Sequence, residues 1–218
     1  EGHALSSPSK QVGGDFYDVV PVEDGSYLIA IADVSGKGVP AALLSSMLQA
    51  SLRTQAGNVL GLGDILRNIN LLLYRSTEIQ QFATFFLARI DCPSGRLAFS
   101  NAGHNWPVVL RHGVSPVYLD CGGTILGILE GARYEEGQVR LAPGDRVILY
   151  TDGISEAMNA DNEQFGDERL VSLVSDLPRE LSAREVAERI LEALREFLGP
   201  IEPQDDMTLL VLRVLEPV

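Results

Sequence analysis

The chain has 218 residues, enough for one large domain or two small ones, and 45% of them are hydrophobic, so it can bury a substantial core. Its net charge of −13 is opposite in sign to that of a typical nucleic-acid-binding protein. No apolar run approaches the roughly 18 residues of a membrane span, no signal peptide is visible, and Cys92 and Cys121 form no disulfide framework, so we expect a reduced, cytoplasmic protein without membrane contact.

The first predicted element is a hairpin. Residues 1–12 are polar and predict no element. Asp24-Gly25 then separates two strand-like runs, which predicts that residues 16–22 pair with residues 27–33. The second run is short and apolar, as in a buried strand, and it ends on a carboxylate, Asp33.

A turn and two helices are predicted to follow Asp33. Gly36 and Gly38 allow a tight turn and close approach of a ligand to the backbone. Apolar residues recur at helical spacing from residue 40 to residue 56. A second amphipathic helix begins near Asp64, a plausible N-cap. Because the loop between them is short, we expect an antiparallel helix pair.

The rest of the chain does not alternate strand and helix, so a doubly wound parallel sheet is not expected. Four strand candidates resemble an antiparallel meander, and Ser182 with Glu185 predicts a capping box. The expected strands are 82–90, 96–101, 106–111, 115–119, 134–141, 145–151 and 207–215, and the expected helices are 154–158, 166–175 and one beginning at 182. We predict an α+β fold with two mainly antiparallel sheets and helices packed outside, in a single domain, 1–218.

Acidic residues recur at strand ends. Asp33, Asp152 and Asp205-Asp206 each stand at one end of a strong strand, and Asp15 lies on the partner of the first strand. Because side chains alternate along a strand, only one of Asp15 and Asp18 can face a common site. Such hard oxygen ligands suit Mg²⁺ or Mn²⁺. Two ions would offset the repulsion among the carboxylates and lower the pKa of a bridging water.

Seven segments, in this order, resemble the SpoIIE-like (RsbU-type) branch of the PPM metal-dependent serine/threonine phosphatases. They are GGDFYD, ADVSGKGVPAAL, FATFFLARID, NAGHNWP, LYTDGISEAMN, EQFG and DDMTLLVLR, and the resemblance covers about residues 12 to 213. The resemblance implies an α-β-β-α sandwich with a dinuclear Mn²⁺ or Mg²⁺ site at one edge of the sheets. It also implies a phosphoserine or phosphothreonine substrate on a small regulatory protein, typically a STAS-domain anti-sigma-factor antagonist.

The resemblance assigns roles to individual residues. The implied metal ligands are Asp15, Asp33, Val34 through its carbonyl, Asp152, Asp205 and Asp206. Asp33 would bridge both ions, and Asp33, Asp152 and Asp205 would be the catalytic residues. Asp15 is preferred over Asp18, for which a structural role is favoured, and His104 is interpreted as a turn residue. A general acid and a phosphate-binding residue have no clear counterpart in this sequence.

We therefore expect a bacterial Mn²⁺- or Mg²⁺-dependent protein phosphatase of sigma-factor regulation, in which a metal-bridging hydroxide attacks phosphorus in line. The alternative is a catalytically weak regulatory module that keeps the fold and binds a partner protein. Expected partners are the phosphorylated substrate and an upstream sensor or dimerisation segment, with residues 39–76 as the regulatory switch. The abrupt start at Glu1 fits a catalytic domain excised from a longer sensor protein.

Overall fold

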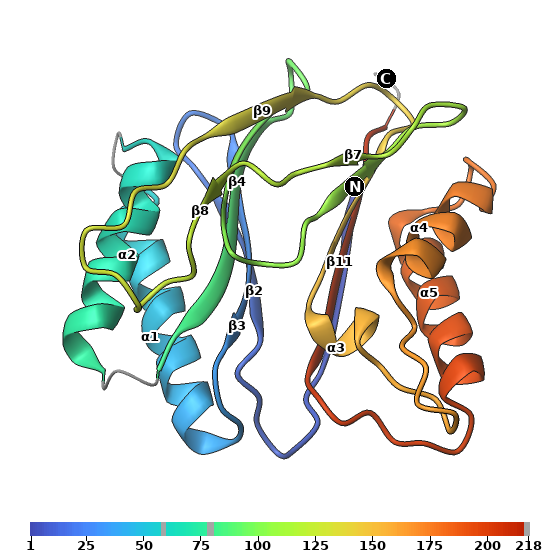
Figure 1. Cartoon of the computed structure of the whole chain (residues 1–218). Coiled ribbons are helices and arrows are strands. Elements are labelled where there is room, and N and C mark those ends of the chain that lie inside the picture. Colours follow the sequence, from blue (N-terminus) through green and yellow to red (C-terminus); the bar gives the residue numbers. More distant parts are fainter. Residues whose placement is uncertain (58–59, 78–80, 216–218) are drawn as a thin grey trace. The chain divides into compact units, whose positions relative to one another are not determined.

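The computed structural model describes residues 1–57, 60–77 and 81–215, and the chain divides into two compact units (Figure 1). The five-stranded unit comprises Glu1–Ser9, Pro107–Tyr118 and Ala142–Val218, and the six-stranded unit comprises Lys10–Trp106 and Leu119–Leu141. Each unit is assembled from separate stretches of the chain. The single domain stays a prediction.

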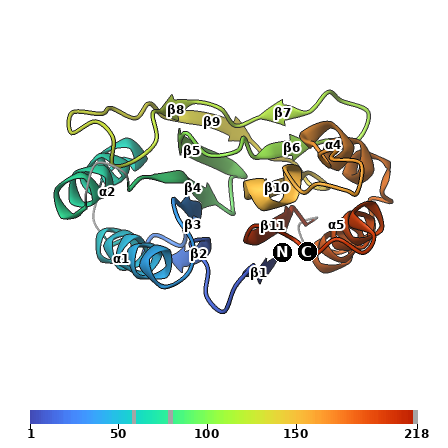
Figure 2. The same cartoon turned by 60° about the horizontal axis from the view of Figure 1, so that its bottom comes forward.

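The six-stranded unit contains the predicted hairpin and helix pair. Its elements are β2 (Phe16–Pro21), β3 (Tyr27–Val34), α1 (Val39–Gln55), α2 (Leu62–Ser76), β4 (Ala83–Asp91), β5 (Arg96–Ala102), β8 (Gly122–Gly123) and β9 (Gly137–Arg140). The strand order is β2-β3-β4-β5-β8, with β9 also paired to β5 (Figure 2). All pairs are antiparallel except β5 with β8, so the mainly antiparallel pairing is confirmed for this sheet.

β3 is buried on both of its faces. Leu28, Ala30 and Ala32 pack in one core with apolar residues of α1 and α2, which cover that face of the sheet (Figure 1). Ile29 and Ile31 point to the opposite face and are buried as well. Burial on both sides explains why the sequence of this strand is a continuous apolar run instead of an alternating one.

The N-cap predicted for the second helix is wrong. α2 begins earlier, with Gly61 as its N-cap, and Asp64 lies inside the first turn, where it pairs with Arg67. A carboxylate in the first turn is favoured by the helix dipole, so the same residue type satisfies both positions. The missing cap is supplied from elsewhere, because the backbone N–H of Gly63 donates to Glu136 Oε1 at 3.0 Å.

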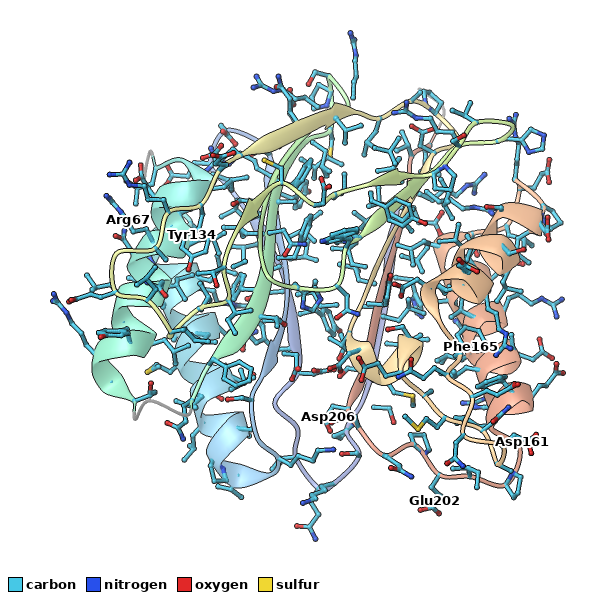
Figure 3. All side chains as sticks on the ribbon, viewed as in Figure 1. Arg67, Tyr134, Asp161, Phe165, Glu202 and Asp206 are labelled. Atoms are coloured by element: carbon cyan, nitrogen blue, oxygen red, sulfur yellow. The ribbon has the colours of Figure 1, made fainter. Side chains whose placement is uncertain are left out.

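The five-stranded unit is antiparallel throughout, in the order β1-β11-β10-β6-β7. Its elements are β1 (Gly2–Ser7), β6 (Val108–Leu110), β7 (Val117–Tyr118), β10 (Arg146–Tyr150), α3 (Asp152–Ser155), α4 (Asp167–Asp176), α5 (Ala183–Leu198) and β11 (Met207–Arg213). α4 and α5 pack on this sheet, and Phe165 meets Phe197 of α5 edge to face (Figure 3).

Two predictions about strands are corrected. The four strands expected as one meander belong to two sheets, because β6 pairs with β10 and not with β5. The polar segment for which no element was predicted contains β1, an edge strand that pairs with β11. A partly exposed edge strand needs no apolar alternation, so its sequence has no strand signal.

In the part of the chain that the structure describes, no helix combines the length and apolar character needed to cross a membrane.

The capping box of α5 is confirmed and predicts a pH-dependent stability. Ser182 Oγ accepts from the Glu185 N–H at 3.2 Å, and Glu185 Oε2 accepts from the Ser182 N–H at 2.8 Å. We expect Ser182→Ala to lower the free energy of unfolding by about 1 kcal/mol at pH 7. Urea unfolding measures the loss, and Ser175→Ala, within α4, is the control and should change stability by less than about 0.5 kcal/mol.

The hydrogen bonds from Ser182 hold the pKa of Glu185 below its usual value of 4.5. A lowered folded-state pKa contributes stability above the unfolded pKa, and this stability is lost as the pH falls through the folded pKa. The difference between wild type and Ser182→Ala should therefore be smaller at pH 4 than at pH 7. An equal difference at both pH values would contradict the role of the Glu185 charge.

Candidate functional site

Asp15, Asp33 and Val34 lie together at one end of the six-stranded sheet. The register of β2 on β3 pairs Phe16 with Ala32, and its continuation places Asp15 opposite Asp33. The preceding residue, Gly14, lies so close to Val34 that an added Cβ would be 2.7 Å from the Val34 carbonyl oxygen. This end of the unit therefore presents two carboxylates and a backbone carbonyl to one region.

Asp18 lies on the other face of β2 and serves a different purpose. Its carboxylate is 5% exposed and accepts from Arg53 Nε at 2.7 Å and Arg53 Nη2 at 2.8 Å, and Gln49 Nε2 donates to it at 3.3 Å. The ion pair raises the pKa of Arg53. Asp18 thus fastens α1 to β2, which is the structural role that the sequence favoured.

The turn after Asp33 is fixed to the start of β4. Ser35 N–H donates to the Phe82 carbonyl at 2.9 Å, and Phe82 N–H donates to Ser35 Oγ at 2.9 Å. Gly36 and Gly38 then adopt φ values of +95° and +76°, as the turn prediction requires, and α1 starts directly after Gly38. The position of Asp33 is therefore constrained by the strand before it and by the pinned turn after it.

In the five-stranded unit, Asp152 lies beside the segment that precedes β11. Thr151 N–H donates to the Thr208 carbonyl at 3.0 Å, and Thr208 N–H donates to Thr151 Oγ1 at 2.9 Å. Gly153 lies so close to this segment that a Cβ there would overlap the backbone carbonyl of Asp206. These contacts bring Asp152, the first residue of α3, to the edge of the sheet where β11 begins.

Asp205 and Asp206 differ in their surroundings. Asp206 is 7% exposed, and its Oδ1 accepts from the N–H of Ser9 at 2.7 Å and from Ser9 Oγ at 3.0 Å, next to the start of β11 (Figure 3). Asp205 Oδ1 accepts from the Asp206 N–H at 2.9 Å. Asp206 therefore holds the chain after β1, which makes it a weaker candidate ligand than Asp205.

The predicted ligands are divided between the units: Asp15, Asp33 and Val34 belong to the six-stranded unit, and Asp152, Asp205 and Asp206 belong to the five-stranded unit. Within residues 1–57, 60–77 and 81–215, no group of three or more His, Cys, Asp or Glu side chains is gathered closely enough to hold a metal ion. The donors in both units are carboxylate and carbonyl oxygens, a set that fits Mg²⁺ or Mn²⁺ in chemical type.

Sequence reasoning missed several buried hydroxyl and imidazole groups. Thr151 and Thr208 are fully buried, and His104, interpreted as a turn residue, is 2% exposed with its Nδ1 2.8 Å from Thr84 Oγ1. Thr84 and Thr208 stand inside apolar runs, where one hydroxyl gives no pattern. The segment NAGHNWP, with its glycine and proline, indicated a turn at His104 and gave no other local signal for this residue.

The contact at Gly153 gives a test of how Asp152 is positioned. We expect Gly153→Ala to lower the free energy of unfolding by about 1–3 kcal/mol, because the new methyl group must push α3 away from the Asp205-Asp206 backbone. Gly131→Ala is the control, since nothing lies within 4 Å of a Cβ there. Urea unfolding of both variants checks this, and equal stability of the two would contradict the close packing.

Comparison with known proteins identifies the family of the chain. The family model of Stage II sporulation protein E (SpoIIE) matches residues 23–215. The phosphoserine phosphatase RsbU of Bacillus subtilis is 31% identical over 211 residues, which cover 96% of this chain and 62% of that protein. Protein IcfG of Synechocystis is 27% identical over 241 residues, covering 96% of this chain and 37% of that protein, so the chain spans less than two thirds of either relative.

The solved structures agree with this family. The SiaA-PP2C domain of Pseudomonas aeruginosa matches with a TM-score of 0.85 and 27% identity, covering 97% of this chain and 85% of that one. The PP2C phosphatase domain of SpoIIE from Bacillus subtilis matches with a TM-score of 0.79 and 23% identity, over 98% and 62% of the two chains. The predicted fold class is confirmed as the PP2C type, and the chain belongs to the SpoIIE family.

Proposed function

We propose that this chain is a phosphoserine/phosphothreonine protein phosphatase that depends on Mn²⁺ or Mg²⁺. The observation that carries the proposal is the placement of aspartates at strand ends in a member of the SpoIIE family, together with 31% identity to a phosphoserine phosphatase. The net charge of −13 argues against a nuclease or phosphodiesterase, because an acidic surface repels the phosphates of a nucleic acid.

The proposed ligands are the carboxylates of Asp15, Asp33, Asp152 and Asp205 and the carbonyl of Val34, with Asp206 as a neighbouring acid that holds Ser9. When bound, the ions would neutralise charge on the phosphate oxygens and lower the pKa of a bound water. The chain itself supplies position. The pinned turn at Ser35 restrains Asp33, and the contact at Gly153 restrains Asp152.

The proposed substrate is a small phosphorylated regulatory protein of the STAS type, in bacterial sigma-factor signalling in the cytoplasm. This proposal rests on the family and on the resemblance to its RsbU-type branch. The matched relatives are longer than this chain, which leaves room in them for sensor or dimerisation segments. We propose that such a segment acts on α1 and α2, because α1 follows directly from the Asp33 turn.

The experiment is release of phosphate from p-nitrophenyl phosphate and from a phosphoserine protein while Mn²⁺ is titrated. Asp33→Asn should reduce turnover to background at every Mn²⁺ concentration, because it removes the proposed bridging charge while changing the side-chain volume little. Asp161→Asn, at an exposed loop position, is the matched control and should keep wild-type turnover (Figure 3). EDTA should abolish the wild-type activity.

Wild-type turnover by Asp33→Asn at saturating Mn²⁺, or a rate that EDTA does not change, would contradict the proposed mechanism. Binding of the phosphorylated protein without any release of phosphate, with Mn²⁺ or with Mg²⁺, would instead support the alternative of a regulatory module.

A further inference from the structure

Four side chains form a row across the end of the six-stranded sheet. The register of β3 on β4 pairs Asp33 with Thr84, and Asp15 continues the row on the other side of Asp33. Directly opposed residues of an antiparallel pair share a face, with Cβ atoms about 4.5–5.5 Å apart. On the far side of Thr84, His104 Nδ1 lies 2.8 Å from the Thr84 hydroxyl oxygen. Thr84 therefore has the imidazole of His104 at its hydroxyl and Asp33 as its opposed residue on β3.

The loop that carries His104 is built to hold it. The side chain of Asn101, 2% exposed, accepts from the His104 N–H at 2.7 Å and donates to the His104 carbonyl at 3.0 Å. Gly103 has a φ of +68°, and a Cβ there would overlap the side chain of Ile125. A turn that only reversed the chain would not need a buried side-chain amide that bonds to both the N–H and the carbonyl of the same residue. The construction fixes where the imidazole lies.

A threonine hydroxyl has one hydrogen to donate and two lone pairs that accept. If the Nδ1–H of His104 donates to Thr84 Oγ1, the hydroxyl hydrogen must point elsewhere, and the Asp33 carboxylate is on the same face at the opposed position. We propose that His104 is a positioning residue, which acts through Thr84 to orient the Asp33 carboxylate for a divalent cation. This inference rests on the proposed function.

Substitution by the two amides separates this role from others. The side-chain nitrogen of asparagine falls near the position of Nδ1, whereas that of glutamine falls near the position of Nε2. A role through Thr84 requires a hydrogen-bond donor at the Nδ1 position. His104→Asn should therefore keep the affinity for the divalent cation, and His104→Gln should lower it. A residue that touched the substrate through Nε2 would give the opposite order, with the change in kcat and not in metal binding.

The test is the Kd for Mn²⁺ alone, measured by titration calorimetry on the full chain without substrate. We expect His104→Ala and Thr84→Val each to raise this Kd about 10- to 100-fold, as loss of a group that orients a metal ligand does. The double variant should be no weaker than the single variants, because both remove the same link. His104→Asn and Thr84→Ser should bind nearly as wild type. Circular dichroism and urea unfolding establish that each variant is folded.

The outcomes distinguish this inference from the proposed function. If wild type binds Mn²⁺ and the folded Thr84→Val variant has an unchanged Kd, the positioning role is overturned and the phosphatase proposal stands. Independent, additive losses in the double variant would also overturn it. If wild type binds no Mn²⁺ at millimolar concentration, the proposed function fails, and this inference fails with it.

Discussion

The burial of β3 on both faces is the constraint on which the rest of the site in the six-stranded unit depends. Because Leu28 to Ala32 are enclosed on either side, a shift of one residue in register would exchange the two sets of buried side chains, which differ in size. The register is therefore fixed to both neighbours, and with it the positions of Asp15 and Thr84 relative to Asp33. A short apolar run thus determines which polar groups meet at the sheet end.

The hydrogen-bond donors around each aspartate separate the acids that join segments of the chain from the candidate metal ligands. Asp18 accepts two hydrogen bonds from one guanidinium, and Asp206 accepts two from Ser9, so both carboxylates serve to join separate segments. Releasing either carboxylate to a cation would break the hydrogen bonds that join these segments. Sequence spacing alone could not separate these two acids from Asp15 and Asp205, because their partners are 35 and 197 residues away.

Most helices and strands could be predicted, because their signals are local: periodic apolar residues, a capping box, and turns at Asp24-Gly25 and Gly36. The sequence could not predict which sheet each strand joins. β5 and β6 follow each other closely in the chain but belong to different sheets. The acids at strand ends were visible for the same local reason. Thr84 and His104 were not, because their meeting depends on the clasp of Asn101 and on the register of β4.

The proposed link through Thr84 would hold the Asp33 carboxylate in a different way from the ion pair that holds Asp18. Arg53 satisfies Asp18 with a charge, and that ion pair would compete with any cation for the same oxygens. A hydroxyl can orient a carboxylate through one hydrogen bond and leave its negative charge available. In the proposed arrangement, the imidazole of His104 would fix the direction of that hydrogen bond through the Thr84 hydroxyl.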